Sequence, residues 1–287
     1  MERTVPGRND DHMRCGVRDC AADGYTYRRF GPLSSVECNN LGLTNLGAFL
    51  VQEMMRKHML VEVGHMSALA VNHTLDIAEA FDYPGVVSGH TGFFDVSHGQ
   101  AGHEGNLTGA QVERVRHLGG MVGVLTRLGN LHEISTWRGG GATVIEHQCG
   151  NTAETWAQAY LYAIEKMEHA PVAFGSDFNG FNGLPGPRFG REQCPGGGPY
   201  GTSPRQALRY PFKARAAADR LMSRSLIGTR TYDINTDGLA HVGMLPDFIA
   251  DLESFSLNAS DLEPLLKSAE GYIRLWERAL AVHVPPP

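Results

Sequence analysis

Two histidines and one aspartate each follow a short apolar segment of this chain. The segments are residues 60–64 before His65, 85–89 before His90 and 171–176 before Asp177. An apolar run that ends in small residues is typical of a buried parallel strand in an α/β fold. Because the carboxyl ends of parallel strands meet at one edge of a sheet, we expect these three side chains to lie around one opening.

Imidazole and carboxylate groups in this arrangement favour zinc chemistry. Neutral imidazole nitrogens are good zinc ligands, and a carboxylate can complete the site or act as a base on metal-bound water. Each residue also has a structural interpretation, since a lone histidine often only donates a hydrogen bond and an aspartate often caps a turn. The repetition at three strand ends favours the metal site, with His65 and His90 as ligands and Asp177 as the catalytic residue.

Helical and strand-like segments alternate between residues 44 and 177. We expect strands at 60–64, 86–89, 121–125 and 171–176, and helices at 44–58, 68–82, 108–118 and 152–168. Thr44 and Ser67 have the residue types of helix N-caps, and Thr108 with Gln111 has the polar signature of a helix start. Strands separated by helices predict parallel pairing with right-handed crossovers.

The two ends of the chain differ from this central part. We interpret residues 1–40 as an irregular N-terminal arm and 41–287 as one α/β domain with a C-terminal helical extension from about residue 204. Helices are expected at 204–227, within 237–253 and at 260–282, and no strand is expected there.

Composition excludes some classes of partner. The 287-residue chain has a net charge of −6 and lacks a cluster of basic residues, so we expect no nucleic-acid partner. We expect no membrane partner either, because no apolar run approaches the ~20 residues that a spanning helix needs. Without a recognisable signal peptide, a cytoplasmic location is expected. The five cysteines are an odd number with irregular spacing, which favours free thiols, with Cys15–Cys20 pairing as the alternative in an oxidising compartment.

Several of these segments resemble the membrane (renal) dipeptidase branch of the metal-dependent amidohydrolase superfamily. They are Val61-Glu62-Val63-Gly64-His65-Met66-Ser67, Val87-Ser88-Gly89-His90 and Phe174-Gly175-Ser176-Asp177-Phe178-Asn179-Gly180. The stretches 105–108 and 118–124 are similar to the link between the sixth and seventh strands of that branch. The resemblance covers about residues 38–180.

The resemblance implies a TIM-barrel-like (β/α)8 fold with one or two zinc ions, which hydrolyses dipeptides and related amides, sometimes lactams or lactones. His65 matches the metal ligand of the fifth strand, His90 that of the sixth, and Asp177 the acid of the eighth that handles the proton of the nucleophilic water. We expect substrate or outer-sphere roles for four further side chains, namely His98, His103, Arg188 and His241.

The chain also departs from the family pattern. Such enzymes begin with His-x-His or His-x-Asp on the first strand, and no such pair precedes His65. The branch commonly has an arginine shortly after the sixth-strand histidine, and residues 91–105 contain none. The sequence therefore predicts only strands five to eight of the barrel. A half barrel leaves open sheet edges. Three explanations are open: the chain is a truncated barrel, the 1–40 arm covers the edge, or a second copy does so in a homo-oligomer, which we favour.

Two functions follow from these observations. The first is a zinc-dependent hydrolase that acts on a small-molecule or dipeptide-like substrate through an activated water. The alternative is a catalytically inactive barrel remnant that serves as a binding or assembly module, because two histidines and one acid are marginal for tight metal binding.

Overall fold

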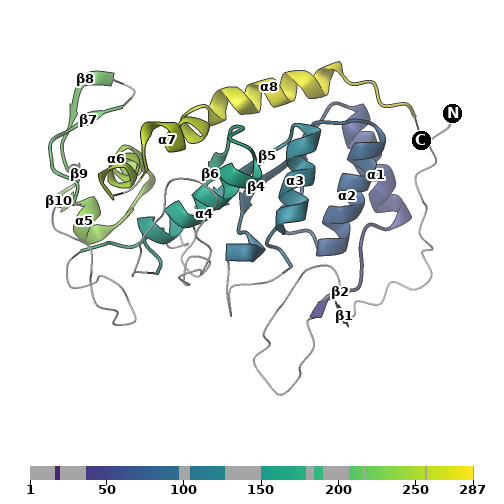
Figure 1. Cartoon of the computed structure of the whole chain (residues 1–287), viewed down its shortest axis with the longest axis horizontal. Helices are drawn as coiled ribbons and strands as arrows, with labels where there is room; N and C mark the ends of the chain where they lie inside the picture. Colours follow the sequence, from purple (N-terminus) through teal and green to yellow (C-terminus); the bar gives the residue numbers. More distant parts are fainter. Residues whose placement is uncertain are drawn as a thin grey trace.

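The structure is a computed structural model that describes residues 17–19, 37–96, 104–126, 150–178, 184–189, 207–215, 217–255 and 257–286. A four-stranded sheet lies at its centre, with the strands in the order β3-β4-β5-β6 (Figure 1). These strands are β3 (Val61–Glu62), β4 (Val86–Thr91), β5 (Met121–Leu125) and β6 (Ala173–Gly175). All three pairings are parallel, as the alternation of segments predicted.

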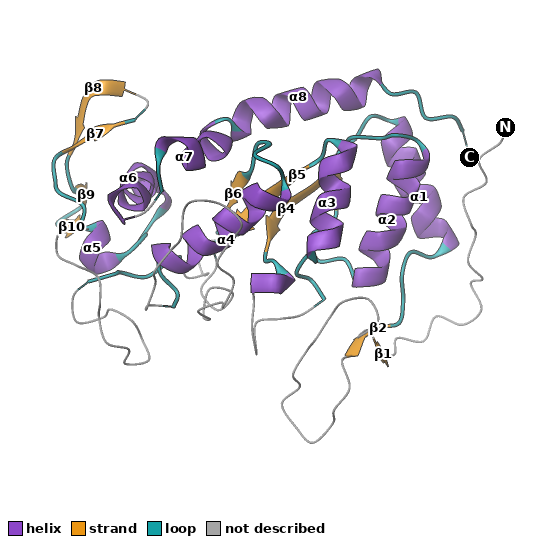
Figure 2. Ribbon diagram, viewed as in Figure 1, coloured by secondary structure: helices purple, strands orange, loops and turns teal. Residues whose placement is uncertain are grey.

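Four helices precede or connect these strands. They are α1 (Asn45–Arg56), α2 (Ala68–Ala80), α3 (Gly109–Leu118) and α4 (Ala153–Lys166). Figure 2 shows α1, α2 and α3 side by side next to the sheet. The predicted caps are confirmed: Thr44 and Ser67 accept hydrogen bonds from backbone amides of the first helical turn, and Thr108 forms a capping box with Gln111.

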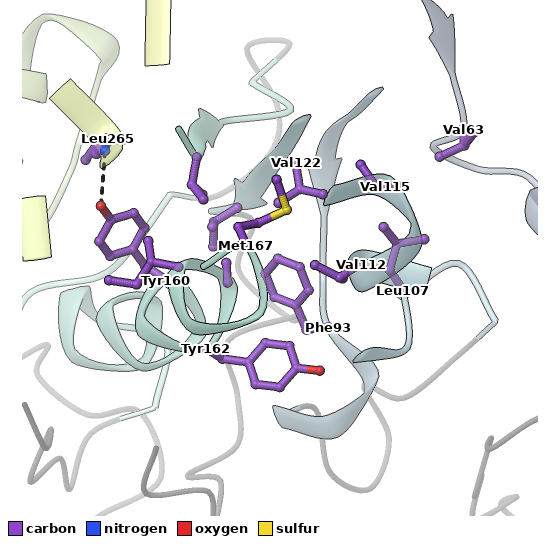
Figure 3. Close-up of a cluster of buried hydrophobic side chains, with 14 of the residues drawn as sticks. Val63, Phe93, Leu107, Val112, Val115, Val122, Tyr160, Tyr162, Met167 and Leu265 are labelled. Carbon is purple, nitrogen blue, oxygen red and sulfur yellow. Dashed lines mark hydrogen bonds between the residues drawn. The ribbon is translucent and has the colours of Figure 1, made fainter. Parts of the chain in front are cut away.

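The hydrophobic core lies between the sheet and these helices. Figure 3 shows part of it, where Val112 and Val115 of α3 and Met167 at the end of α4 pack near Val122 of β5. Large aromatic side chains complete the core on the α4 side, and Trp156 stacks on Tyr160 with ring centroids 5.1 Å apart. Burial of these apolar surfaces is the main force that holds the helices on the sheet.

The prediction of a helix at 204–227 is wrong. Short antiparallel strands, which the sequence did not predict, lie between residues 212 and 232: β7 (Phe212–Ala214), β8 (Ala217–Met222), β9 (Ser225–Ile227) and β10 (Arg230–Tyr232). β7 pairs with β8, and β9 pairs with β10 across a two-residue loop that begins at Gly228, with φ 60°. A positive φ is readily adopted by glycine, so Gly228 favours this tight turn.

The remaining C-terminal residues are helical, as predicted, with one difference. The elements are α5 (Ile234–Asp237), the 3₁₀ helix η5 (Val242–Met244), α6 (Leu245–Phe255), α7 (Ala259–Leu266) and α8 (Ser268–Ala281). The single helix expected at 260–282 is divided into α7 and α8 at Lys267. α8 crosses the ends of α3 and α1, where Arg278 donates to the carbonyl of Gly119 and His58 Nδ1 lies 3.0 Å from the carbonyl of Ala279.

The predicted irregular arm contains a short antiparallel ladder. β1 (Val17–Asp19) pairs with β2 (Glu37–Asn39). Cys38 is disulfide-bonded, and its partner cysteine lies outside the described residues. The expectation of free thiols is therefore wrong for Cys38, because the cysteine spacing that we used does not reveal a pairing set by the fold.

Within the described residues, β3 and β6 are the edges of the central sheet, since each has one neighbouring strand. This arrangement agrees with the α/β, TIM-barrel-like class and with the presence of four of its strands. None of the helices that the structure describes combines the length and apolar character required for a bilayer crossing.

Candidate metal-binding site

The structure brings His65 and His90 together. Their Nε2 atoms are 2.8 Å apart and their ring centroids 4.9 Å, with His65 exposed and His90 half-buried. His65 follows β3 and has a left-handed backbone with φ 64°, which is uncommon for a residue with a side chain. His90 lies within the neighbouring strand β4. The two imidazoles therefore converge from adjacent strands, as the sequence predicted.

An irregularity in β4 accompanies the position of His90. The pairing of β4 with β5 shifts register between Ser88 and Thr91. A Cβ atom at Gly123 of β5 would lie 2.3 Å from the carbonyl oxygen of Gly89. A Cβ at Gly175 of β6 would lie 2.5 Å from that oxygen and 2.7 Å from the Cα of His90. Only glycine leaves room for this close backbone approach.

Asp177 follows β6, two residues after Gly175, the last residue of that strand. Thr126 at the end of β5 holds the segment, because its amide donates to the carbonyl of Gly175 at 3.1 Å and its Oγ1 donates to that of Ser176 at 3.2 Å. The amide of Phe178 donates to Ser176 Oγ at 3.3 Å. Asp177 is half-buried, and its φ of 45° is again left-handed. Residues in this conformation often occur at functional sites.

Glu62 of β3 is a residue at this site that our interpretation of the sequence did not single out. Its carboxylate accepts hydrogen bonds from the amides of Gly64 and Gly89, at 2.7 and 2.8 Å. These two glycines directly precede His65 and His90. An acidic residue between the buried Val61 and Val63 was the available signal, since charge is unusual in a short strand.

Arg188, predicted to bind substrate, is engaged in the protein interior. It is 2% exposed, and its Nη2 and Nε atoms donate to the carboxylate of Asp251 at 2.5 and 3.1 Å. Its Nη1 lies 3.6 Å from Glu154 Oε1. Burial raises the pKa of Asp251 above its ordinary value, although the Arg188 guanidinium acts in the opposite direction. This geometry supports a structural role in joining the 184–189 segment to α4 and α6.

The other predicted side chains are not brought to the histidine pair by any contact that the structure describes. His241 precedes η5 and packs edge-on against Tyr232 of β10, with ring centroids 5.0 Å apart. His98 and His103 lie outside the described residues.

The donor set fits part of a zinc site. Zinc binds imidazole nitrogen at about 2.0–2.1 Å, and the convergent Nε2 atoms of His65 and His90 can serve as two ligands after the rings part slightly. In the described part of the chain, no group of three or more His, Cys, Asp or Glu side chains is arranged to hold a metal ion. Zinc requires three or four ligands, so the two imidazoles alone do not complete such a site.

A protein-family comparison identifies related sequences. The family model described as membrane dipeptidase (peptidase family M19) matches residues 21–187, which is more than half of the chain. A comparison with curated protein sequences found no match.

Solved structures share the fold at low sequence identity. The dipeptidase AC, a metallopeptidase of family M19, has a TM-score of 0.50 and 20% identity, over 83% of this chain and 49% of that one. A Rhodobacter sphaeroides metallopeptidase liganded with a phosphinate mimic of the dipeptide L-Ala-D-Ala has a TM-score of 0.50 and 19% identity, over 85% and 51%. The probable dipeptidase PvdM from Pseudomonas aeruginosa has a TM-score of 0.50 and 14% identity, over 84% and 55%. The chain thus spans about half the length of these proteins.

Proposed function

Because the chain belongs to the membrane dipeptidase family, we propose that it takes part in metal-dependent hydrolysis of the amide bond of a dipeptide-like substrate, with zinc as the metal. The observation that carries this proposal is the convergence of the His65 and His90 Nε2 atoms, 2.8 Å apart, from the neighbouring strands β3 and β4. Asp177 follows β6 of the same sheet, which β5 separates from β4.

The three residues have different roles in this proposal. His65 and His90 hold the ion through Nε2. When bound, zinc lowers the pKa of a coordinated water to about 7 and so supplies a nucleophile at neutral pH. Asp177 accepts a proton from the attacking water and delivers it to the leaving amine. The Thr126 and Ser176 contacts fix the backbone on either side of Asp177, which limits the directions in which its carboxylate can point.

The remaining ligands have to come from elsewhere. A catalytic zinc usually has three protein ligands, and the described residues contain no group of three side chains arranged to hold one. The missing ligands can come from residues outside the described part of the chain or from a second chain. We propose self-association as the route, because large apolar side chains are exposed on α1 and α8. These are Leu46, Phe49, Leu50, Ile273, Trp276 and Leu280, with exposed fractions from 49% to 75%.

The substrate class rests on the family and on one relative. The Rhodobacter sphaeroides metallopeptidase is liganded with a phosphinate mimic of L-Ala-D-Ala, so a dipeptide is the first substrate to assay here. Related lactams and lactones are the next class. The disulfide at Cys38 favours a compartment in which disulfides form, in place of the cytoplasm expected from the sequence.

Asp177→Asn is the direct test of catalysis. Asparagine tolerates a left-handed backbone as aspartate does, so the variant should fold normally. We expect zinc-loaded protein to hydrolyse dipeptides, and the variant to lose at least about 100-fold in kcat, the usual contribution of a general base. Asp82→Asn is the matched control, because Asp82 also has a positive φ, of 51°, but is exposed at the end of α2.

The alternative function is that of an inactive binding or assembly module. It is favoured by the arrangement of only two ligands among the described residues. A zinc-loaded protein without hydrolytic activity on dipeptides, lactams or lactones, and with equal behaviour of the Asp177→Asn and Asp82→Asn variants, would support this alternative and contradict the enzyme.

A further inference from the structure

Glu62 occupies an unusual place in β3. Its neighbours Val61 and Val63 are each 1% exposed and belong to the core. Because side chains alternate along a strand, Glu62 lies on the opposite, exposed face. An exposed glutamate can be hydrated by water alone, yet both carboxylate oxygens of Glu62 accept hydrogen bonds from backbone amides.

The carboxylate joins the two segments that carry the histidines. Oε1 accepts from the amide of Gly64 at 2.7 Å, and Oε2 accepts from the amide of Gly89, on the neighbouring strand, at 2.8 Å. Hydrogen bonds to an ionised acceptor are roughly twice as strong as neutral ones. One side chain thus holds the amides of both glycines that precede His65 and His90.

The glycines make this contact possible. A Cβ atom at Gly64 would lie 2.8 Å from Glu62 Oε1 and 3.2 Å from His90 Cε1, and one at Gly89 would lie 2.9 Å from Glu62 Oε2. Glycine also leaves the backbone before each histidine with more conformational freedom than any other residue. A restraint on both amides is therefore what limits the directions of the two imidazoles.

We propose that Glu62 is a positioning residue: it anchors the Val63–Gly64 and Ser88–Gly89 peptide units, one residue before His65 and His90, so that the two Nε2 atoms converge. This inference rests on the proposed function in one respect, namely that the ion held by His65 and His90 is zinc. The convergence itself is a property of the metal-free chain. Glu62 does not contact the substrate or the reacting atoms in this proposal.

The first experiment uses the metal-free full chain. Proton NMR should show nuclear Overhauser effects between the rings of His65 and His90, and amide hydrogen exchange should show protection at Gly64 and Gly89. In Glu62→Gln the amide group can accept only one of the two hydrogen bonds, and in Glu62→Asp the shorter arm cannot span both. We expect both variants to lose the ring–ring signal and to exchange faster at the two glycines. Glu270→Gln is the control, since Glu270 is an exposed glutamate of α8 that pairs with Arg274.

The second experiment measures the affinity for Zn²⁺ by competition with a chromophoric chelator. Outer partners of metal ligands typically contribute about 10- to 100-fold in affinity, and we expect a loss of this size in both Glu62 variants and none in Glu270→Gln. Circular dichroism should be unchanged in all of them. A full ring–ring signal in Glu62→Gln, or native affinity in Glu62→Asp, overturns the positioning role. If the native chain binds no zinc, the proposed function fails, and the NMR result alone decides on Glu62.

Discussion

His65 and Asp177 are both held in a left-handed backbone conformation, with φ values of 64° and 45°. Such conformations cost free energy in residues with side chains and persist where the surrounding structure fixes them. Around Asp177 the fixing contacts are the hydrogen bonds of Thr126 and Phe178 to Ser176. The two residues that we assign to metal binding and proton transfer are therefore placed by their backbones as much as by their side chains.

Gly175 provides a prediction at this scale. In Gly175→Ala, the new Cβ would meet the Gly89 carbonyl and the His90 Cα at 2.5 and 2.7 Å, so β4 has to move. Overpacking of this kind costs about 1–3 kcal/mol, and the displacement of His90 should also weaken zinc binding. Chemical denaturation and a zinc titration measure the two effects.

Gly47→Ala is the control for this substitution. Gly47 lies in α1, and its Cβ would meet its nearest neighbour, Thr44 Oγ1, at 3.4 Å. Because alanine favours a helix over glycine, the control should be neutral or slightly stabilising. If Gly175→Ala and the native chain have equal stability and equal zinc affinity, the close contact of Gly175 with the Gly89 and His90 backbone of β4 is contradicted.

Among the elements, α4 carries the connection between the sheet and the C-terminal helices. Tyr160 of α4 donates through its hydroxyl to the carbonyl of Asp261 at 2.6 Å. The same hydroxyl accepts from the amide of Leu265 at 3.1 Å (Figure 3). The hydroxyl is thus inserted between two groups of α7 that are four residues apart, next to Pro264 within the same helix. Burial raises the pKa of Tyr160, so it stays a donor at neutral pH.

Tyr160→Phe should therefore destabilise the fold. The substitution removes the hydroxyl and leaves a buried amide and a carbonyl of α7 without this partner, at a cost of about 1–3 kcal/mol. Urea unfolding monitored by circular dichroism measures the change. Tyr272→Phe, at a 45% exposed position of α8, should change the free energy of unfolding by less than about 0.5 kcal/mol. Similar unfolding midpoints for both variants would show that the α4–α7 contact contributes little.

The sequence predicted some elements better than others for physical reasons. The strands and helices from α1 to β6 were predicted because hydrophobic periodicity, N-caps and glycine stops agree with one another there. The 204–227 segment was assigned a helix from its alanines and arginines, but helix propensity is a weak influence that tertiary contacts override. In the structure Phe212 packs edge-on against Tyr210, and Arg215 pairs with Glu253 of α6.

The site was predicted in part for a similar reason. Recognisable strand patterns precede His65, His90 and Asp177, so the sequence could predict that these residues lie at strand ends. The role of Glu62 depends on the Gly89 amide, 27 residues away, and that of Gly175 depends on the backbone of a strand to which it is not paired. Such contacts join residues that are far apart in the sequence, and a linear pattern does not contain them.

At the scale of the whole molecule, the chain spans about half the length of its solved relatives and brings two imidazoles together among its described residues. Exposed apolar residues on α1 and α8 provide surfaces through which a second chain can associate. A complete metal site requires ligands beyond the His65–His90 pair, and we propose that association of chains supplies them.

Native mass spectrometry tests this central claim most directly, because it reports bound zinc and the mass of the assembly together. For this 31.2 kDa chain we expect a dimer that retains zinc. His65→Asn should keep the dimer and lose the zinc, since asparagine tolerates the left-handed backbone but lacks the imidazole. His169→Asn should keep both, because His169 has a similar φ of 60° but is exposed at the end of α4. Equal zinc content in the native chain and His65→Asn, or no zinc in either, would contradict the metal site.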